Sequence, residues 1–165
     1  KLYFDPNLCY PADQVPEEIK KATRELADLC DVVLTGETEM RALGLSPKKG
    51  QCYLVKCGGK GSKWMDEKEV ERYQIPATKH RPTDTTGAGD TFMAAFVAAE
   101  AEGASVEKAM RFASVAAGIA VTKTGARNMP RKGQILEVLE EYEKELEEKN
   151  EKKTGRQEEE NGRLE

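Results

Sequence analysis

The stretch PTDTTGAGDTFMAAF, residues 82–96, holds the residues whose types and spacing could carry out chemistry. Gly87, Ala88 and Gly89 are three small residues at the start of an expected helix, where backbone N–H groups can point into one shared space and bind phosphate oxygens. Asp90 follows directly. A carboxylate beside an anion site can take the proton of an alcohol while fixed dipoles stabilise a phosphoryl group in transfer. The stretch therefore indicates phosphoryl transfer to a hydroxyl group.

Simpler and competing explanations account for less of this stretch. A helix start needs one glycine for a turn and one acidic residue at its positive end, worth ~0.5 kcal/mol, which leaves Thr85, Thr86 and the second glycine unexplained. A dinucleotide fingerprint requires a third glycine where Phe92 stands, and the GGKGSK segment at 58–63 does not match a Walker P-loop. Neither of these nucleotide folds is expected.

Short apolar runs alternate with helical patterns along most of the chain. This alternation predicts an α/β fold with a mostly parallel sheet covered by helices. The expected strands are 2–4, 31–35 and 52–57 and a hairpin of 62–65 with 70–75, and the expected helices are 16–29, 37–43, 89–102, 105–122 and 133–149. Ser105 is the expected N-cap of its helix.

Two segments carry further expectations. In helix 16–29, Ile19, Ala22, Leu26 and Leu29 recur at helical spacing and are expected to form its buried face. From about Lys144 the chain has mixed charges and almost no apolar residues, so residues 144–165 are expected to be a charged tail that is a frayed helix or disordered.

Composition limits the class of protein. The 165 residues suffice for one domain, and 38% hydrophobic and 34% charged residues with a net charge of −4 are typical of a cytoplasmic globular protein without nucleic-acid or membrane partners. The four cysteines form no Cys-x-x-Cys pair and are expected to be reduced, partly buried thiols. The first residue is Lys1 and residues 1–7 already resemble a core strand, so the chain is expected to begin within a longer protein.

The sequence resembles the ribokinase-like, or PfkB, carbohydrate kinases. DTTGAGDTFMAAFV at 84–97 matches the family's C-terminal signature. Further agreement follows in order in FDPN at 4–7, GETE at 36–39, VKCGGKGS at 55–62 and RFASVAAGIAVTKTGA at 111–126. The resemblance covers residues 2–140. It implies a truncated ribokinase-like fold that lacks the N-terminal half and its lid, with residues 1–143 as the ATP-binding part.

The resemblance implies a role for each matching residue. Asp90 would be the general base that takes a sugar proton, and the amides of Gly87, Ala88 and Gly89 would form the anion hole for the γ-phosphoryl group of ATP. Glu39 would act on Mg²⁺ through water. The residues implied at the nucleotide are Lys56, Gly58, Gly61, Thr86, Ala113, Ser114 and Ala117. The residues that resemble a K⁺ site of some members are Asp84, Thr86, Val121 and Gly125.

Several residues have a simpler interpretation or depart from the family pattern. Lys56 could be a solvated lysine at a strand end, Glu39 an exposed helix residue and Asp84 the cap of a turn. Gly36 stands where the family has Asn, which removes an amide from the magnesium and phosphate network. The only histidine, His80, is interpreted as a solvated loop residue, and Trp64 is expected to pack within the hairpin.

Two function classes follow from the sequence. One is an ATP-dependent sugar kinase that is active when completed by a missing N-terminal half or by a partner copy in a homo-oligomer. The other is a non-catalytic nucleotide-binding or interaction domain. The intact loop and Asp90 favour the first, whereas Gly36 and the absent lid favour the second for this chain in isolation.

Overall fold

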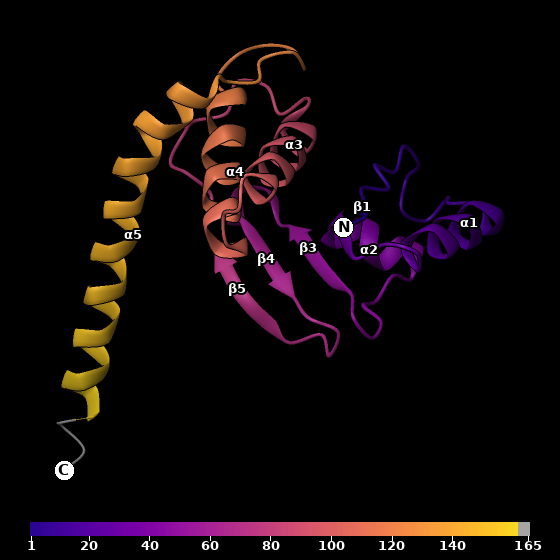
Figure 1. Ribbon diagram of the computed structural model, residues 1–165, viewed down its shortest axis with the longest axis horizontal. Helices are drawn as coiled ribbons and strands as arrows, with labels where there is room; N and C mark the ends of the chain where they lie inside the picture. The colour runs from indigo at the N-terminus through magenta and orange to yellow at the C-terminus, as the bar shows by residue number, and fades with distance from the viewer. Residues whose placement is uncertain (162–165) are drawn as a thin grey trace.

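A five-stranded sheet forms the centre of the protein (Figure 1). The computed structural model describes residues 1–161, and the side chains of residues 1–148. The strands lie in the order β1 (Tyr3–Phe4), β2 (Val32–Gly36), β3 (Cys52–Lys56), β4 (Ser62–Met65) and β5 (Glu71–Ile75). Strands β1, β2 and β3 are parallel, and β4 runs antiparallel to β3 and β5. The α/β fold class and the β4–β5 hairpin are therefore confirmed.

Within residues 1–161, five α-helices pack around the sheet or beside it. They are α1 (Glu17–Ala27), α2 (Glu37–Leu43), α3 (Ala88–Ala101), α4 (Val106–Ala120) and α5 (Lys132–Asn161). In Figure 1, α3 and α4 lie together on one side of the strands, while α5 packs beside α4 and then extends past the sheet. Helix α5 continues beyond residue 149, where the expected helix ended.

Successive side chains along a strand point to opposite faces of the sheet, so the sheet has a hydrophobic core on each face. Val32, Leu34 and Leu54 point to the face that packs on α3, α4 and α5. Val33 and Tyr53, one residue out of phase, point to the opposite face under α1 and α2. Strands β2 and β3 are thus buried between two helical layers, whereas β5 is exposed except at Ile75. This packing fixes the positions of the loops at the ends of β2 and β3.

Helix α1 does not bury the face that its sequence predicts. Ala27 is buried and Ile19 is partly buried against the sheet, but Ala22 is exposed and Leu26 and Leu29 are 52% and 71% exposed. The face that packs instead runs through Ile19 and Ala27, which join Val33 of β2 and Tyr53 of β3 in one core cluster. The Gln51 side-chain amide also donates to the Ala27 carbonyl at 2.8 Å, which holds this face inward.

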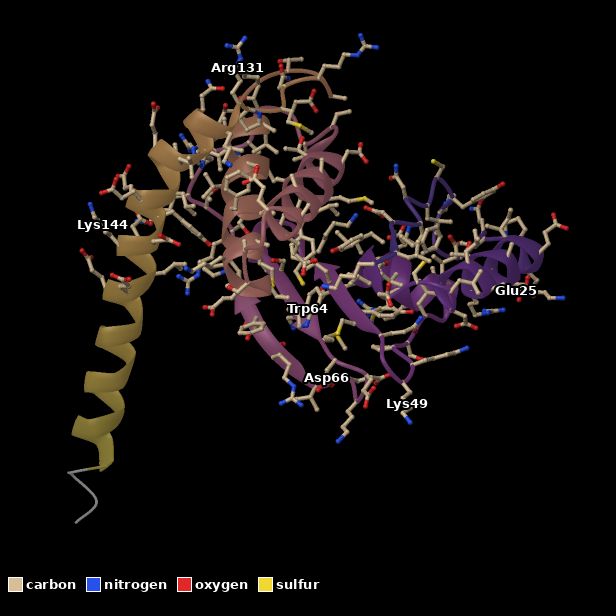
Figure 2. The ribbon with its side chains drawn as sticks, in the orientation of Figure 1. Glu25, Lys49, Trp64, Asp66, Arg131 and Lys144 are labelled. Carbon is tan, nitrogen blue, oxygen red and sulfur yellow. The ribbon has the colours of Figure 1, made fainter. Side chains whose placement is uncertain are left out.

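Trp64 packs as the sequence predicts. Its side chain is buried, and its ring centroid lies 5.8 Å from that of Phe96 on α3. Figure 2 shows Trp64 in the interior, whereas Glu25 points away from the sheet on the outer side of α1. The cysteines are free thiols, although Cys9 is exposed and not partly buried. No helix among the described residues combines the length and apolar composition needed to cross a bilayer.

Candidate functional site

The loop that precedes α3 has the geometry of an anion site. Gly87 adopts φ 77° at the N-cap, and a Cβ there would lie 2.9 Å from the Ala126 carbonyl oxygen, so only glycine fits. The Ala88 N–H donates to the Thr85 carbonyl at 3.1 Å. Within residues 1–148, the Gly87 and Gly89 N–H groups donate to no protein acceptor. Two of the three expected anion-hole amides therefore remain available to a ligand.

Asp90 lies in the first turn of α3 and is exposed. Its carboxylate makes no hydrogen bond or ion pair with the described side chains and backbone. An exposed and unpaired carboxylate next to available amides can accept a proton from a bound hydroxyl group. The geometry is thus compatible with the predicted base.

A cavity of about 370 Å³ begins at this loop and runs between β4 and α4. The predicted residues that line it are Lys56, Gly58, Gly61, Ala88, Gly89, Ser114, Ala117 and Val121. Ala113 is fully buried in the core and does not line the cavity, whereas Ala117, one turn further along the same face of α4, does. Thr86 is outside the lining, and its neighbour Thr85 contributes instead.

The cavity also has walls that sequence reasoning missed. Ser62, Thr78, His80 and Gly118 line it. His80 is partly buried, with its Nδ1 atom 2.9 Å from Thr78 Oγ1, so its interpretation as a solvated loop residue is wrong. A Cβ on Gly118 would lie 2.0 Å from Thr78 Oγ1, which shows how closely the two segments cross. A lone glycine within an alanine-rich helix was the available signal.

Two glycines shape the turn between β3 and β4. Gly58 has φ 55° and begins a short 3₁₀ helix (Gly58–Lys60). Gly61 has φ 96°, and a Cβ there would lie 2.0 Å from the Ile75 carbonyl oxygen. This turn can therefore approach the end of β5 only with glycine at position 61, and it leaves the backbone exposed to the cavity.

Lys56 lies at the end of β3, between this cavity and a second one. The second cavity, of about 470 Å³, is also lined by Gly58, Gly36 and Glu39. Lys56 Nζ forms an ion pair with Asp5 Oδ2 at 2.5 Å, and the lysine side chain is 23% exposed. Lys56 is thus a partly buried and paired lysine, not a solvated one.

Glu39 is a hydrogen-bonded capping residue in this structure. Its Oε2 atom accepts from Thr35 Oγ1 at 2.9 Å and from the Gly36 N–H at 3.1 Å, and its Oε1 atom accepts from the Leu8 N–H at 2.6 Å. Three of about four acceptor positions are used. The remaining capacity fits a water molecule that in turn binds Mg²⁺, but not direct chelation. Among the described residues, no three His, Cys, Asp or Glu side chains form a metal cluster.

The residues of the predicted K⁺ site come together through hydrogen bonds. Asp84 Oδ1 accepts from the N–H and hydroxyl of Thr86 at 2.9 and 2.7 Å, and Oδ2 accepts from the Gly125 N–H at 2.8 Å. These bonds, first that from the Thr86 hydroxyl, lower the pKa of Asp84 from 3.8 to about 2. The Val121 carbonyl accepts from Thr83 and Asp84 N–H groups, and the Gly125 carbonyl accepts from Asn128. These bonds order the loop from Asp84 to Gly125 through protein donors, and the K⁺ site stays a prediction.

Comparison with known proteins shows the family to which the chain belongs. A model of the pfkB family of carbohydrate kinases matches residues 1–132. The chain belongs to the pfkB carbohydrate kinase family. A ribokinase of Arabidopsis thaliana is 38% identical over 134 residues, covering 70% of this chain and 35% of the relative, and a ribokinase of Bacillus subtilis is 42% identical over 104 residues, covering 62% and 33%.

Solved structures of the pfkB family agree with the fold. The ribokinase of Thermotoga maritima has a TM-score of 0.64 at 31% identity, covering 84% of this chain and 48% of that one. The Arabidopsis thaliana ribokinase, solved with ribose and ATP, has a TM-score of 0.66 at 32% identity over 83% of this chain and 46% of that one. The chain thus spans half or less of the length of these relatives, and its ribokinase-like fold is shown.

Proposed function

We propose that the chain is the ATP-handling part of a phosphotransferase that acts on a carbohydrate hydroxyl group. The observation that carries the proposal is the cavity of about 370 Å³ that opens at Ala88 and Gly89, directly beside the exposed Asp90. Its volume and its glycine-rich, largely apolar walls suit a nucleotide. The family membership and the ATP-bound relative support the same ligand.

In this proposal each part of the site has one task. The Gly87 and Gly89 amides at the positive end of α3 hold the γ-phosphoryl group, and Asp90 accepts the proton of the attacking hydroxyl. Glu39 orients a water molecule toward Mg²⁺, which when bound with ATP would neutralise phosphate charge. No step requires K⁺, since Asp84 already orders the loop through Thr86 and Gly125.

A second candidate function is a nucleotide-binding domain without catalysis. It is favoured by Gly36, which supplies no side-chain amide to the phosphates. In the first candidate a separate half of the fold, or a second copy, supplies the acceptor contacts. Orienting two reactants can lower a barrier by about 7–11 kcal/mol, and that term requires contacts to both.

Titration with Mg-ATP tests the shared nucleotide site. Heat of binding and Trp64 fluorescence should both saturate at or below millimolar ATP. Gly87→Ala should weaken this binding at least several-fold, because its Cβ collides with Ala126 and shifts the loop. Gly133→Ala, where a Cβ meets nothing within 4 Å, is the matched control and should bind as wild type does. No saturable binding at millimolar ATP would overturn the proposal.

Measuring ADP release by the same chain separates the two candidates. With hexoses, pentoses, nucleosides or sugar acids added, we expect at most slow hydrolysis that no acceptor stimulates, because these 165 residues cover only 48% of the matched Thermotoga maritima ribokinase and the proposal takes the acceptor contacts from outside them. Joining residues 2–140 to the rest of a ribokinase should then restore sugar-dependent ADP release. If every such chimera binds ATP but none releases ADP in a sugar-dependent way, the non-catalytic candidate is favoured.

A further inference from the structure

We propose that Asp5 is a positioning residue that fixes Lys56 against the anion loop, so that the ion pair acts as a phosphate clamp across the ends of three strands. The inference rests on the proposed function and names a residue to which that function gives no role. Lys56 Nζ lies 2.5 Å from Asp5 Oδ2 and 3.5 Å from the position that a Cβ on Gly89 would take. The ammonium group is therefore held beside the amides that would bind phosphate.

The ion pair is built into the fold and is not a chance surface contact. The Asp5 side chain is only 7% exposed, and its other oxygen accepts from the Asn7 N–H at 3.2 Å. Asn7 has φ 44°, a left-handed conformation that asparagine tolerates, and this turn aims Asp5 back at β3. A carboxylate at this depth needs a partner, and Lys56 is the one cation paired with it among the described residues.

Gly36 lies at the end of the strand that separates Asp5 from Lys56. Strand β2 lies between β1 and β3, so the bond from Lys56 to Asp5 passes over the end of β2, where Gly36 has no side chain. A Cβ there would come no closer than 3.9 Å to any neighbour. The space that an amide would fill thus remains open beside Lys56, in the cavity of about 470 Å³ that the lysine shares with Glu39. One of the three ammonium donors is used by Asp5, and the other two can reach phosphate oxygens.

The direction in which Asp5→Asn changes polyphosphate affinity distinguishes a positioning role from a simple charge effect. If Asp5 contributed only its charge, it would repel phosphate, and Asp5→Asn would strengthen binding of any polyphosphate. If Asp5 positions Lys56, the same substitution leaves the lysine side chain mobile. Polyphosphate binding must then fix that side chain, and the lost conformational entropy weakens the binding. Positioning therefore predicts weaker binding of ATP and of tripolyphosphate, about three- to tenfold, with adenosine binding unchanged.

The test measures dissociation constants of adenosine, Mg-ATP and tripolyphosphate for the full chain. Asp28→Asn is the matched control, because it removes the same charge and another ion pair, with Lys48, away from both cavities. It should leave all three constants unchanged. Lys56→Met should weaken the binding of both polyphosphates at least as much as Asp5→Asn does. The double variant should weaken that binding no more than Lys56→Met alone. Asp5→Glu, which keeps the carboxylate, should bind more tightly than Asp5→Asn.

The outcomes separate this inference from the proposed function. Equal or tighter polyphosphate binding by Asp5→Asn, or an equal loss for adenosine, overturns the positioning role even if wild type binds ATP. If wild type binds tripolyphosphate in an Asp5-dependent way but does not bind Mg-ATP, the clamp stands and the nucleotide function fails. If wild type binds neither, both are wrong.

Discussion

Replacing Gly61 by alanine tests whether the turn between β3 and β4 has the close contact that the structure shows. At φ 96° an alanine suffers strain of about 1–2 kcal/mol. Its Cβ would also lie 2.0 Å from the Ile75 oxygen and 2.6 Å from the Pro76 carbonyl carbon. Those atoms are backbone at the end of β5, so they must move by more than about 1 Å to restore normal contact.

The movement acts on the first pair of the β4–β5 ladder, Ser62 with Ile75. The loss of two hydrogen bonds at about 0.5–1.5 kcal/mol each, together with the strain, gives a total of about 2–5 kcal/mol. A domain of this size has only about 5–15 kcal/mol of stability. We therefore expect Gly61→Ala to fold weakly or not at all, and to lose nucleotide binding where it folds.

Urea unfolding followed by Trp64 fluorescence measures this directly, because Trp64 is the only tryptophan and lies on β4 itself. Gly59→Ala, two residues away in the same turn, is the matched control. A Cβ there meets nothing within 4 Å, so its free energy of unfolding should stay within about 0.5 kcal/mol of wild type. Equal stabilities for Gly61→Ala and Gly59→Ala would refute the reasoning.

Two further predictions concern the polar groups of the site. Gly36→Asn should fold normally, since φ is −86° and the nearest atoms to a new Cβ are 3.9 Å away, and its added amide should tighten Mg-ATP binding about three- to tenfold by calorimetry; unchanged affinity would show that the missing amide is not a weakness. Asp84 should stabilise the fold above pH 3.8 and lose this effect as the pH falls toward 2, because its pKa is lowered to about 2 in the folded state. Asp84→Asn should flatten the acid limb of a urea-unfolding series, and an identical limb would contradict the hydrogen bonds seen at Thr86 and Gly125.

The fold and the glycine loop before α3 were predictable because they depend on local signals. The turn before α3 needs glycine because its backbone takes a positive φ, and this signal lies within a few residues. The apolar patterns of strands and helices likewise lie within one segment. Helix α1 shows the limit of this approach, since periodicity gave an apolar stripe through Leu26 and Leu29 but could not tell which stripe faces the sheet.

The remaining site residues depend on contacts between distant segments. His80 becomes a cavity wall only because its segment crosses α4 at Gly118. Asp5 meets Lys56 only because β1 and β3 end on either side of β2. Ala113 and Ala117 have the same side chain and share one face of α4, and only the position of each along the packed helix places one in the core and the other at the cavity. No local pattern carries such information.

Asp90→Asn in a sugar-active chimera tests the central claim most directly. The substitution keeps the shape of the side chain but removes the proton acceptor beside the anion loop. We predict that the dissociation constant for Mg-ATP changes by no more than about twofold while sugar-dependent turnover falls by about 10²-fold or more, the scale of general-base catalysis. Retained turnover, or an equal loss of ATP binding and turnover, would contradict the assignment of Asp90 as the base of a phosphotransferase.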